Sequence, residues 1–231
     1  MTKKYELLQD DTVITPMGKT LYRIKALVAI GPFVSPGDPG GYIEGTKNLD
    51  MSGNAWVFDD AYVGGNALVS GNAWVCGNAR VYGDARVYGD ALVFDDAQVS
   101  DNAQVRDNAC VSGNASVYGN AQVFDNAHVS DNAWLRGDAM AFGDARVYGD
   151  AQVKKKNDIQ WFTNVGPEFG TLTVCKAKKG LFISQGSFSG SLEEFKIAVN
   201  EKYGASKYGS HYQALINAIE IWFTNSNEKD C

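Results

Sequence analysis

The stretch GNAWVFDDAYVGGNALVSGNAWVC, residues 53–76, begins a six-residue repeat that continues in the same frame to GDAQVK, residues 149–154. Residues 53–154 hold 17 hexads with no insertion between them. The third position is Ala in all 17 and the fifth is Val in 15, the exceptions being Leu135 and Ala141. A period this regular indicates a repeat architecture, in which each unit buries its apolar face against its neighbours.

Each hexad combines a short strand with a tight corner. Ala and Val alternate with variable residues, which is the two-residue period of a strand with one buried face. The other two positions hold only Gly, Asp and Asn, which tolerate the left-handed backbone of a corner. We therefore expect a triangular coil of three hexads, or 18 residues, per turn. A weaker hexad at 47–52 places Leu49 and Met51 in the two apolar positions and completes about six coils.

The repeat resembles the hexapeptide-repeat superfamily, whose fold is a left-handed parallel β-helix. Val57 and Ala61 keep that family's spacing between an aliphatic and a small residue, although the corner Gly or Asp falls one place later than usual. The resemblance implies a mainly β protein and the homotrimers that are common in the superfamily. It assigns no activity, because one fold carries many functions.

Two segments without the repeat flank the predicted β-helix, which covers residues 47–154. Residues 1–46 carry a hairpin pattern, TVITP, then a Met-Gly-Lys turn, then TLYRIKALVAI. We expect an N-terminal β cap there, because the first coil of a solenoid exposes strand edges that need cover. Residues 157–231 predict a C-terminal α+β domain of three strands and two helices.

The elements of the C-terminal domain follow from local patterns. The strands are expected in IQWFTNV, residues 159–165, and in TLTVCKAKKGLFISQG, residues 171–186. SLEEFKIAVNEKY is an amphipathic helix, and Ser191 with Glu194 has the spacing of a capping box. A second helix with an apolar stripe is expected over about 210–224.

The order of the flanking segments carries a second resemblance. GKTLYRIKAL, GDPGGYIE, the hexads, WFTNVG and GSFSGSLEEF follow one another as in hexapeptide-repeat proteins of bacteriophages and prophages. Those proteins are mostly uncharacterised and are described as polymer-forming. The resemblance implies an accessory protein made in the cytoplasm of a bacterial host, and it brings no catalytic residue.

Composition excludes several classes of protein. The net charge of −6 argues against direct nucleic-acid binding and against an anionic membrane surface. No apolar run approaches the roughly 18 residues that span a bilayer, and we expect no secretory signal in the segment MTKKYELLQDD, which has no apolar stretch. The four cysteines, Cys76, Cys110, Cys175 and Cys231, lie far apart in no metal-ligand spacing. We expect reduced thiols in a cytoplasmic protein without a metal or another cofactor.

Residues 18 apart lie above one another in such a coil, so outward side chains can be assigned to faces. One face begins with a patch of five apolar residues: Trp56, Phe58, Trp74, Leu92 and Phe94. A contiguous exposed patch of this kind favours association. Two interpretations stay open, a subunit interface of a homotrimer and a surface covered by the chain's own flanks.

The segment GSFSGS, residues 186–191, runs directly into the first C-terminal helix. A Gly/Ser loop at a helix N-terminus presents free backbone N–H groups and the positive end of the helix dipole, which suit a phosphate. The candidate ligand site joins this loop to upstream lysines and a stacking residue: Ser187, Phe188, Ser189, Gly190, Ser191, Lys176, Lys178, Lys179 and Trp161. The alternative is an ordinary capped helix, because Glu193 and Glu194 in the first turn repel an anion.

The superfamily resemblance also implies an acyltransferase, in which a histidine acts as general base. His128, which points outward between Cys110 and Arg146 of its ladder, is the alternative catalytic candidate; His211 lies in the C-terminal domain. A general base needs a residue that orients it and a substrate cleft, and the uninterrupted repeat supplies no loop to form one. We therefore assign no catalytic residue.

Aspartates gather at the corners of the repeat. Residues 53–152 hold 13 Asp against 5 Arg, a net charge of −8. One edge carries five of them: Asp59, Asp60, Asp95, Asp96 and Asp131. Corner chemistry accounts for these residues, and the alternatives are a divalent cation or a surface that imitates the phosphates of DNA.

Together these observations favour a non-enzymatic oligomeric accessory protein that sequesters a phosphorylated small molecule or a nucleotide immune signal of the host. The alternatives are a hexapeptide-type acyltransferase and a scaffold that binds a host protein. A stoichiometric small molecule retained by the purified protein discriminates the first from the other two.

Overall fold

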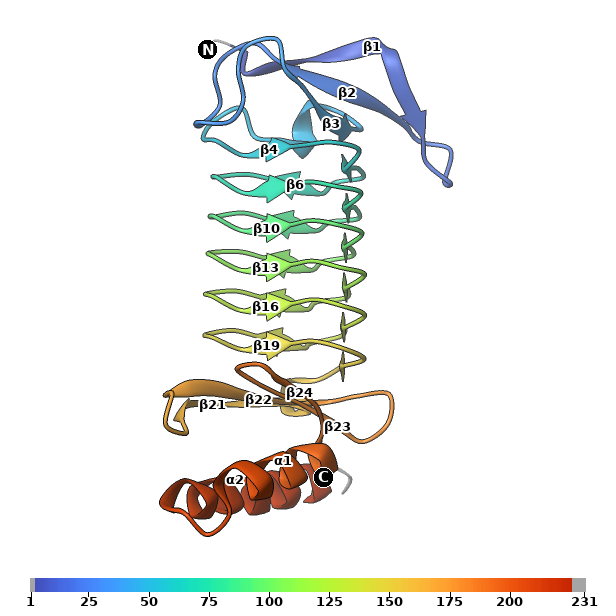
Figure 1. Ribbon diagram of the computed structural model, residues 1–231. Helices are drawn as coiled ribbons and strands as arrows, with labels where there is room; N and C mark the ends of the chain where they lie inside the picture. Colours follow the sequence, from blue (N-terminus) through green and yellow to red (C-terminus); the bar gives the residue numbers. More distant parts are fainter. Residues whose placement is uncertain (1–2, 226–231) are drawn as a thin grey trace.

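A tall stack of coils lies between an N-terminal β cap and a C-terminal α+β unit in the computed structural model, which describes residues 3–225 (Figure 1). Each hexad from residue 53 onward contributes one two-residue strand, and these strands form three parallel sheets. The first sheet contains β4 (Trp56–Val57), β7 (Trp74–Val75), β10 (Leu92–Val93), β13 (Cys110–Val111), β16 (His128–Val129) and β19 (Arg146–Val147). The second contains β6 (Leu68–Val69), β9 (Arg86–Val87), β12 (Gln104–Val105), β15 (Gln122–Val123) and β18 (Met140–Ala141). The third contains β5 (Tyr62–Val63), β8 (Arg80–Val81), β11 (Gln98–Val99), β14 (Ser116–Val117), β17 (Trp134–Leu135) and β20 (Gln152–Val153).

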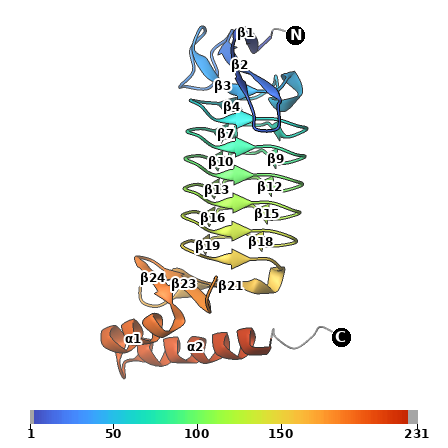
Figure 2. The same cartoon turned by 90° about the vertical axis from the view of Figure 1, so that its right-hand side faces the viewer.

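The register of the strands confirms the predicted 18-residue turn. Leu92 pairs with Trp74 in the coil before it and with Cys110 in the coil after it. The Ala and Val positions are fully buried along the whole interior, including the substituted Leu135 and Ala141. In Figure 2 the third sheet faces the viewer, with the first sheet (β10) on the left and the second (β12) on the right. The chain crosses the third sheet from left to right as the coils descend from the cap, so the solenoid is left-handed.

The N-terminal cap is the predicted hairpin with one further strand. β1 (Tyr5–Ile14) pairs antiparallel with β2 (Thr20–Ala26), and β2 pairs antiparallel with β3 (Pro39–Ile43). β3 then pairs in parallel with β5, so the cap extends the third sheet of the solenoid to nine strands. The chain itself thereby covers the edge of the third sheet at the first coil.

The weak hexad at 47–52 does not keep the frame of the repeat, which corrects the sequence prediction. Leu49 is buried and bridges to Val69, 20 residues later, whereas the repeat would align Met51 with Val69. Met51 is exposed instead. The short helix η1 (Thr46–Asn48) ends directly before Leu49, and the turn from Leu49 to Val69 holds two residues more than the repeat, which shifts the frame.

The C-terminal unit has four strands rather than the predicted three. After the short helix η2 (Lys156–Asp158), the antiparallel sheet runs in chain order through β21 (Ile159–Val165), β22 (Gly170–Lys176), β23 (Leu181–Gln185) and β24 (Phe188–Ser191). Two helices follow, α1 (Leu192–Tyr203) and α2 (Lys207–Asn225), close to their predicted positions. Within residues 3–225, no helix has the length and hydrophobicity to cross a membrane.

The four-stranded sheet lies between the last coil and the two helices (Figures 1 and 2). Alternate residues of β22 face opposite ways: Cys175 belongs to the solenoid core, and Leu172 and Val174 belong to a second core formed with the helices. Thr173 faces the solenoid, where its Oγ1 accepts a hydrogen bond from the backbone N–H of Arg146 at 3.0 Å. The sheet therefore closes the base of the solenoid and also builds the C-terminal unit.

Candidate functional site

The segment predicted as a Gly/Ser phosphate loop is largely strand β24, paired with β23. Ser191 is the N-cap of α1, and the Glu194 carboxylate accepts hydrogen bonds from its backbone N–H and its hydroxyl, each at 2.8 Å. These two hydrogen bonds, and above all the one from the backbone N–H of Ser191, lower the pKa of Glu194. The predicted capping box is confirmed, and a carboxylate of the chain itself occupies the helix N-terminus, the position assigned to the ligand's phosphate.

The predicted lysines lie at the far end of the same sheet. Strand pairing sets Lys176 opposite Leu181 and Leu172 opposite Gln185, so the turn with Lys178 and Lys179 and the turn before Phe188 lie at opposite ends of β23. Lys176 Nζ forms an ion pair with Asp158 Oδ1 at 3.0 Å, and Asp158 is buried. Trp161 also lies apart from the β24 segment, packed edge-on against Phe142 with ring centroids 4.4 Å apart. The structure does not bring the predicted ligand residues together.

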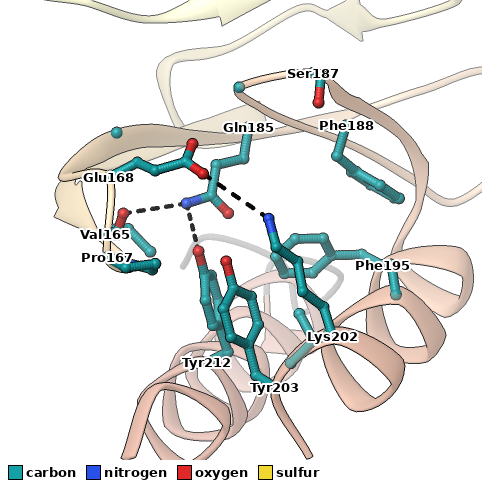
Figure 3. A pocket seen from close by; sticks show the side chains of 14 residues that line it. Val165, Pro167, Glu168, Gln185, Ser187, Phe188, Phe195, Lys202, Tyr203 and Tyr212 are labelled. Atoms are coloured by element: carbon teal, nitrogen blue, oxygen red, sulfur yellow. Dashed lines mark hydrogen bonds and ion pairs between the residues drawn. The ribbon is translucent and has the colours of Figure 1, made fainter.

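Ser187 and Phe188 line a hollow of about 140 Å³ between the strand ends and the helices, which we call the C-terminal hollow (Figure 3). Its floor is aromatic. Tyr203 stacks on Tyr212 with centroids 5.2 Å apart, and Phe195 contacts both Tyr212 and Phe188 at 5.8 and 5.2 Å. Four rings from β24, α1 and α2 therefore meet at this place.

Polar groups converge above the aromatic floor. Gln185 Nε2 donates to the Val165 carbonyl at 3.3 Å and to the Tyr212 hydroxyl at 2.7 Å, which leaves Gln185 Oε1 as an acceptor with no donor from residues 3–225. Lys202 Nζ lies 3.9 Å from a Glu168 carboxylate oxygen, and both side chains are largely exposed at the rim (Figure 3). This long ion pair leaves both charges accessible to a third group.

The backbone conformation of Gly166 and the burial of Tyr212 maintain this arrangement of side chains in the C-terminal hollow. Gly166 has φ +73°, and a Cβ there would lie 2.2 Å from the Tyr212 hydroxyl oxygen, so the hollow requires glycine at this position. Burial raises the pKa of Tyr212, which therefore stays a neutral phenol that both donates and accepts hydrogen bonds. The hollow offers a stacking surface, one cation, one carboxylate and neutral hydrogen-bonding groups.

The aromatic patch of the first coils is partly covered by the N-terminal cap. Trp56 is fully buried and contacts the Tyr5 ring edge-on at 6.2 Å. The loop before β3 places Phe33 against Trp74 at 5.3 Å. Of the five residues predicted for a subunit interface, Leu92 is the most exposed, at 38%.

His128 lies where the register predicted, between Cys110 and Arg146 in the first sheet. Partial burial and then Arg146 lower the pKa of His128, and no residue in the described range donates to or accepts from its ring. Partial burial and Asp95 raise the pKa of Cys110, which disfavours a thiolate. Cys76, Cys110 and Cys175 are free thiols, and Cys231 lies outside the described residues.

The aspartates of the acidic edge bind their own backbone. Asp59, Asp95 and Asp131 accept hydrogen bonds through Oδ2 from the N–H groups of Gly77, Gly113 and Gly149 at 3.0, 3.2 and 3.0 Å. No group of His, Cys, Asp or Glu among the residues that the structure describes is arranged to hold a metal ion. These carboxylates therefore stabilise the corners of the solenoid by accepting hydrogen bonds from the next coil.

Sequence reasoning missed the residues that build the C-terminal hollow beyond Ser187 and Phe188. Tyr203 and Tyr212 lie at the end of α1 and in α2, where an aromatic residue reads as ordinary core. Glu168 lies in the turn between β21 and β22, and Gln185 ends β23; both approach the helices only in the folded chain. The signal in the sequence was the set of aromatic residues on the two helices, Phe195, Tyr203, Tyr208 and Tyr212.

The fold and the register define this chain as a β-solenoid repeat protein. Comparison with known families agrees: the model of the YdcK beta-solenoid repeat matches residues 61–77, 75–88, 79–95 and 85–101. The matches lie in the solenoid and cover less than half of the chain. No curated protein matches the chain significantly.

Proposed function

We propose that this is a non-catalytic ligand-binding protein, in which the solenoid is a rigid support and the C-terminal hollow holds a small molecule. The observation that carries the proposal is the convergence of four aromatic rings with Gln185 Oε1, Lys202 and Glu168 around one cavity. Ligand sites typically combine apolar walls with a few oriented polar groups. The uninterrupted repeat supports the role of a scaffold.

The ligand is a compact polar molecule with an anionic group. Lys202 Nζ lies 5.3 Å from the centroid of the Tyr203 ring, so it reaches an anion placed on the aromatic floor. Gln185 Oε1 and Glu168 accept hydrogen bonds from donors on the same molecule. A volume of about 140 Å³ lies below the roughly 300–1,000 Å³ of sites for larger ligands, so a nucleotide would extend beyond the rim.

The finer proposal is a phage-type accessory protein that sequesters a phosphorylated molecule of its host. The order of the flanking segments supports the phage relationship, and the hexad pattern supports membership of the hexapeptide-repeat superfamily. In this proposal Lys202 binds the phosphate, since Lys176 is paired with Asp158 and lies at the far end of the sheet. The homotrimer belongs to the same proposal.

The test is native mass spectrometry of protein purified gently from bacterial cytoplasm, followed by the same measurement after denaturation. We expect a stoichiometric small molecule that is retained by the native protein and released on unfolding. Lys202→Met should lose it, because its ammonium holds the anionic group. Lys207→Met, which removes an exposed lysine outside the hollow, should retain it. Protein without any retained molecule, or equal retention by both variants, contradicts the proposal.

A further inference from the structure

The three sheets of the solenoid do not end alike at the C-terminal side. The edge of β19 is covered where Thr173 accepts from Arg146, and β20 is covered where Asp158 Oδ2 accepts from the N–H of Lys154 at 2.9 Å. β18 pairs with β15 only, and the backbone N–H groups of Met140 and Phe142 meet no acceptor among residues 3–225. One strand edge therefore stays open beside the C-terminal unit.

Two adjoining hollows lie along this open edge and share Met140, Lys156 and Asn157. Their volumes are about 470 and 520 Å³, within the range of sites for drug-sized ligands. We call them together the junction groove. It shares no lining residue with the C-terminal hollow.

The junction groove has a cationic side. Lys155 and Lys156 are exposed and form no ion pair with any residue from 3 to 225, unlike Lys176. The carboxylate at the groove, Asp138, accepts a hydrogen bond from Asn120 Nδ2 at 3.2 Å. Two unpaired lysines beside open backbone N–H groups favour an anion in a protein whose net charge is −6.

The other side of the groove is aromatic. Phe142 is 37% exposed and stacks on Phe124, with centroids 5.0 Å apart and planes within 4°. Trp161 packs edge-on against Phe142, and Arg106 lies 4.0 Å from the centroid of Phe124 on its far side. These contacts fix the position of Phe142, whose exposed edge belongs to the apolar side of the groove.

We propose that the junction groove is a second ligand site, which binds a planar aromatic ring joined to a phosphate. The ring packs against Met140, Trp161 and the exposed edge of Phe142, and the phosphate binds Lys155, Lys156 and the open N–H groups of β18. This site goes beyond the function proposed for the C-terminal hollow and stands or falls separately from it.

Calorimetric titration with AMP tests the proposal, with adenosine and inorganic phosphate as partial ligands. We expect AMP to bind with a Kd of about 1 mM or tighter, and each partial ligand about tenfold more weakly, because ring and phosphate both contribute. Absence of AMP binding overturns the proposal. So does a partial ligand that binds as tightly as AMP.

Charge-reversal variants locate the site. Lys156→Glu should weaken AMP binding about tenfold or more and keep the thermal midpoint, because this lysine is exposed and unpaired. Lys179→Glu, in the exposed β22–β23 turn, is the matched control and should bind AMP like the original protein. Equal AMP affinity in Lys156→Glu and Lys179→Glu overturns the assignment.

Discussion

The backbone conformation at the first position of each hexad explains why this position holds only Gly or Asp. All 17 of these positions have a left-handed backbone, with φ between 53° and 74°. Eleven are Gly and six are Asp. Each of the six carboxylates accepts a hydrogen bond from the N–H of the residue 18 positions later: Asp59, Asp95, Asp101, Asp107, Asp125 and Asp131. Glycine relieves strain at a corner, whereas aspartate links one coil to the next.

Substitutions at Asp95 separate these two effects. Asp95→Ala keeps a side chain in the left-handed region and removes the acceptor, so we expect a loss of about 2 kcal/mol in the free energy of unfolding. Asp95→Gly removes the acceptor and relieves the backbone, so the loss should be about 1 kcal/mol. Urea unfolding measures both.

The neighbouring Asp96→Ala is the control, since it removes the same charge from a residue whose φ is not positive. It should cost less than Asp95→Ala. Equal stability of the Ala and Gly variants at position 95 would show that the left-handed corner carries no strain.

At the scale of elements, the two ends of the solenoid need opposite caps. The first coil exposes carbonyl groups, and donors satisfy them: Lys4 Nζ donates to the Ala55 carbonyl at 2.7 Å, and Asn48 Nδ2 donates to the Ala67 carbonyl at 2.8 Å. The last coil exposes N–H groups, and acceptors satisfy those beside β19 and β20, as Thr173 and Asp158 do, whereas within residues 3–225 those of β18 stay open. This polarity follows from the corner geometry, because the N–H groups at the second, fourth and sixth positions of a hexad donate to carbonyls of the coil after it.

The buried donor of the N-terminal cap makes stability depend on pH. Lys4 is 3% exposed, and burial lowers its pKa from 10.5 to about 8, with Asp50 opposing the shift. The unfolded chain therefore binds more protons between pH 8 and about 10, so the free energy of unfolding should rise with pH in this window. Below pH 8 both states are protonated and the contribution is flat.

Thermal or urea unfolding from pH 7 to 10 measures this slope against Lys4→Met, which lacks the titrating group. The difference between the two proteins should change across the window in favour of the original chain. Parallel pH profiles would mean that the Lys4 ammonium is not desolvated in the folded state.

At the scale of the whole molecule, the chain has two apolar cores joined by one sheet. The solenoid core runs from the cap to Ile159 and Cys175, and the second core lies between the sheet and the helices. The cap covers Trp56 and contacts Trp74, so the chain itself buries part of the apolar patch. A trimer through this face depends on Leu92, which is exposed, and on the half-buried Phe58, Trp74 and Phe94.

We predict that Leu92→Arg converts the proposed trimer to monomers, because a charge at the centre of the remaining patch opposes its burial. Gln98→Arg, on a different face, should leave the assembly unchanged. Native mass spectrometry or light scattering gives the mass of each. A monomeric original protein removes the trimer from the proposal.

The sequence by itself determined the coil, its 18-residue register and the helix cap at Ser191 with Glu194. These features depend on contacts that are local or that recur identically in every turn, so one hexad predicts the next. The tertiary structure alone decided where the repeat ends, as at Leu49, and that the FSGS segment pairs as a strand. It also decided that Lys176 lies far from Ser187 and that Lys202 lies beside Glu168. Those outcomes depend on strand pairing and helix packing between distant segments, and no local pattern of residues encodes such distances.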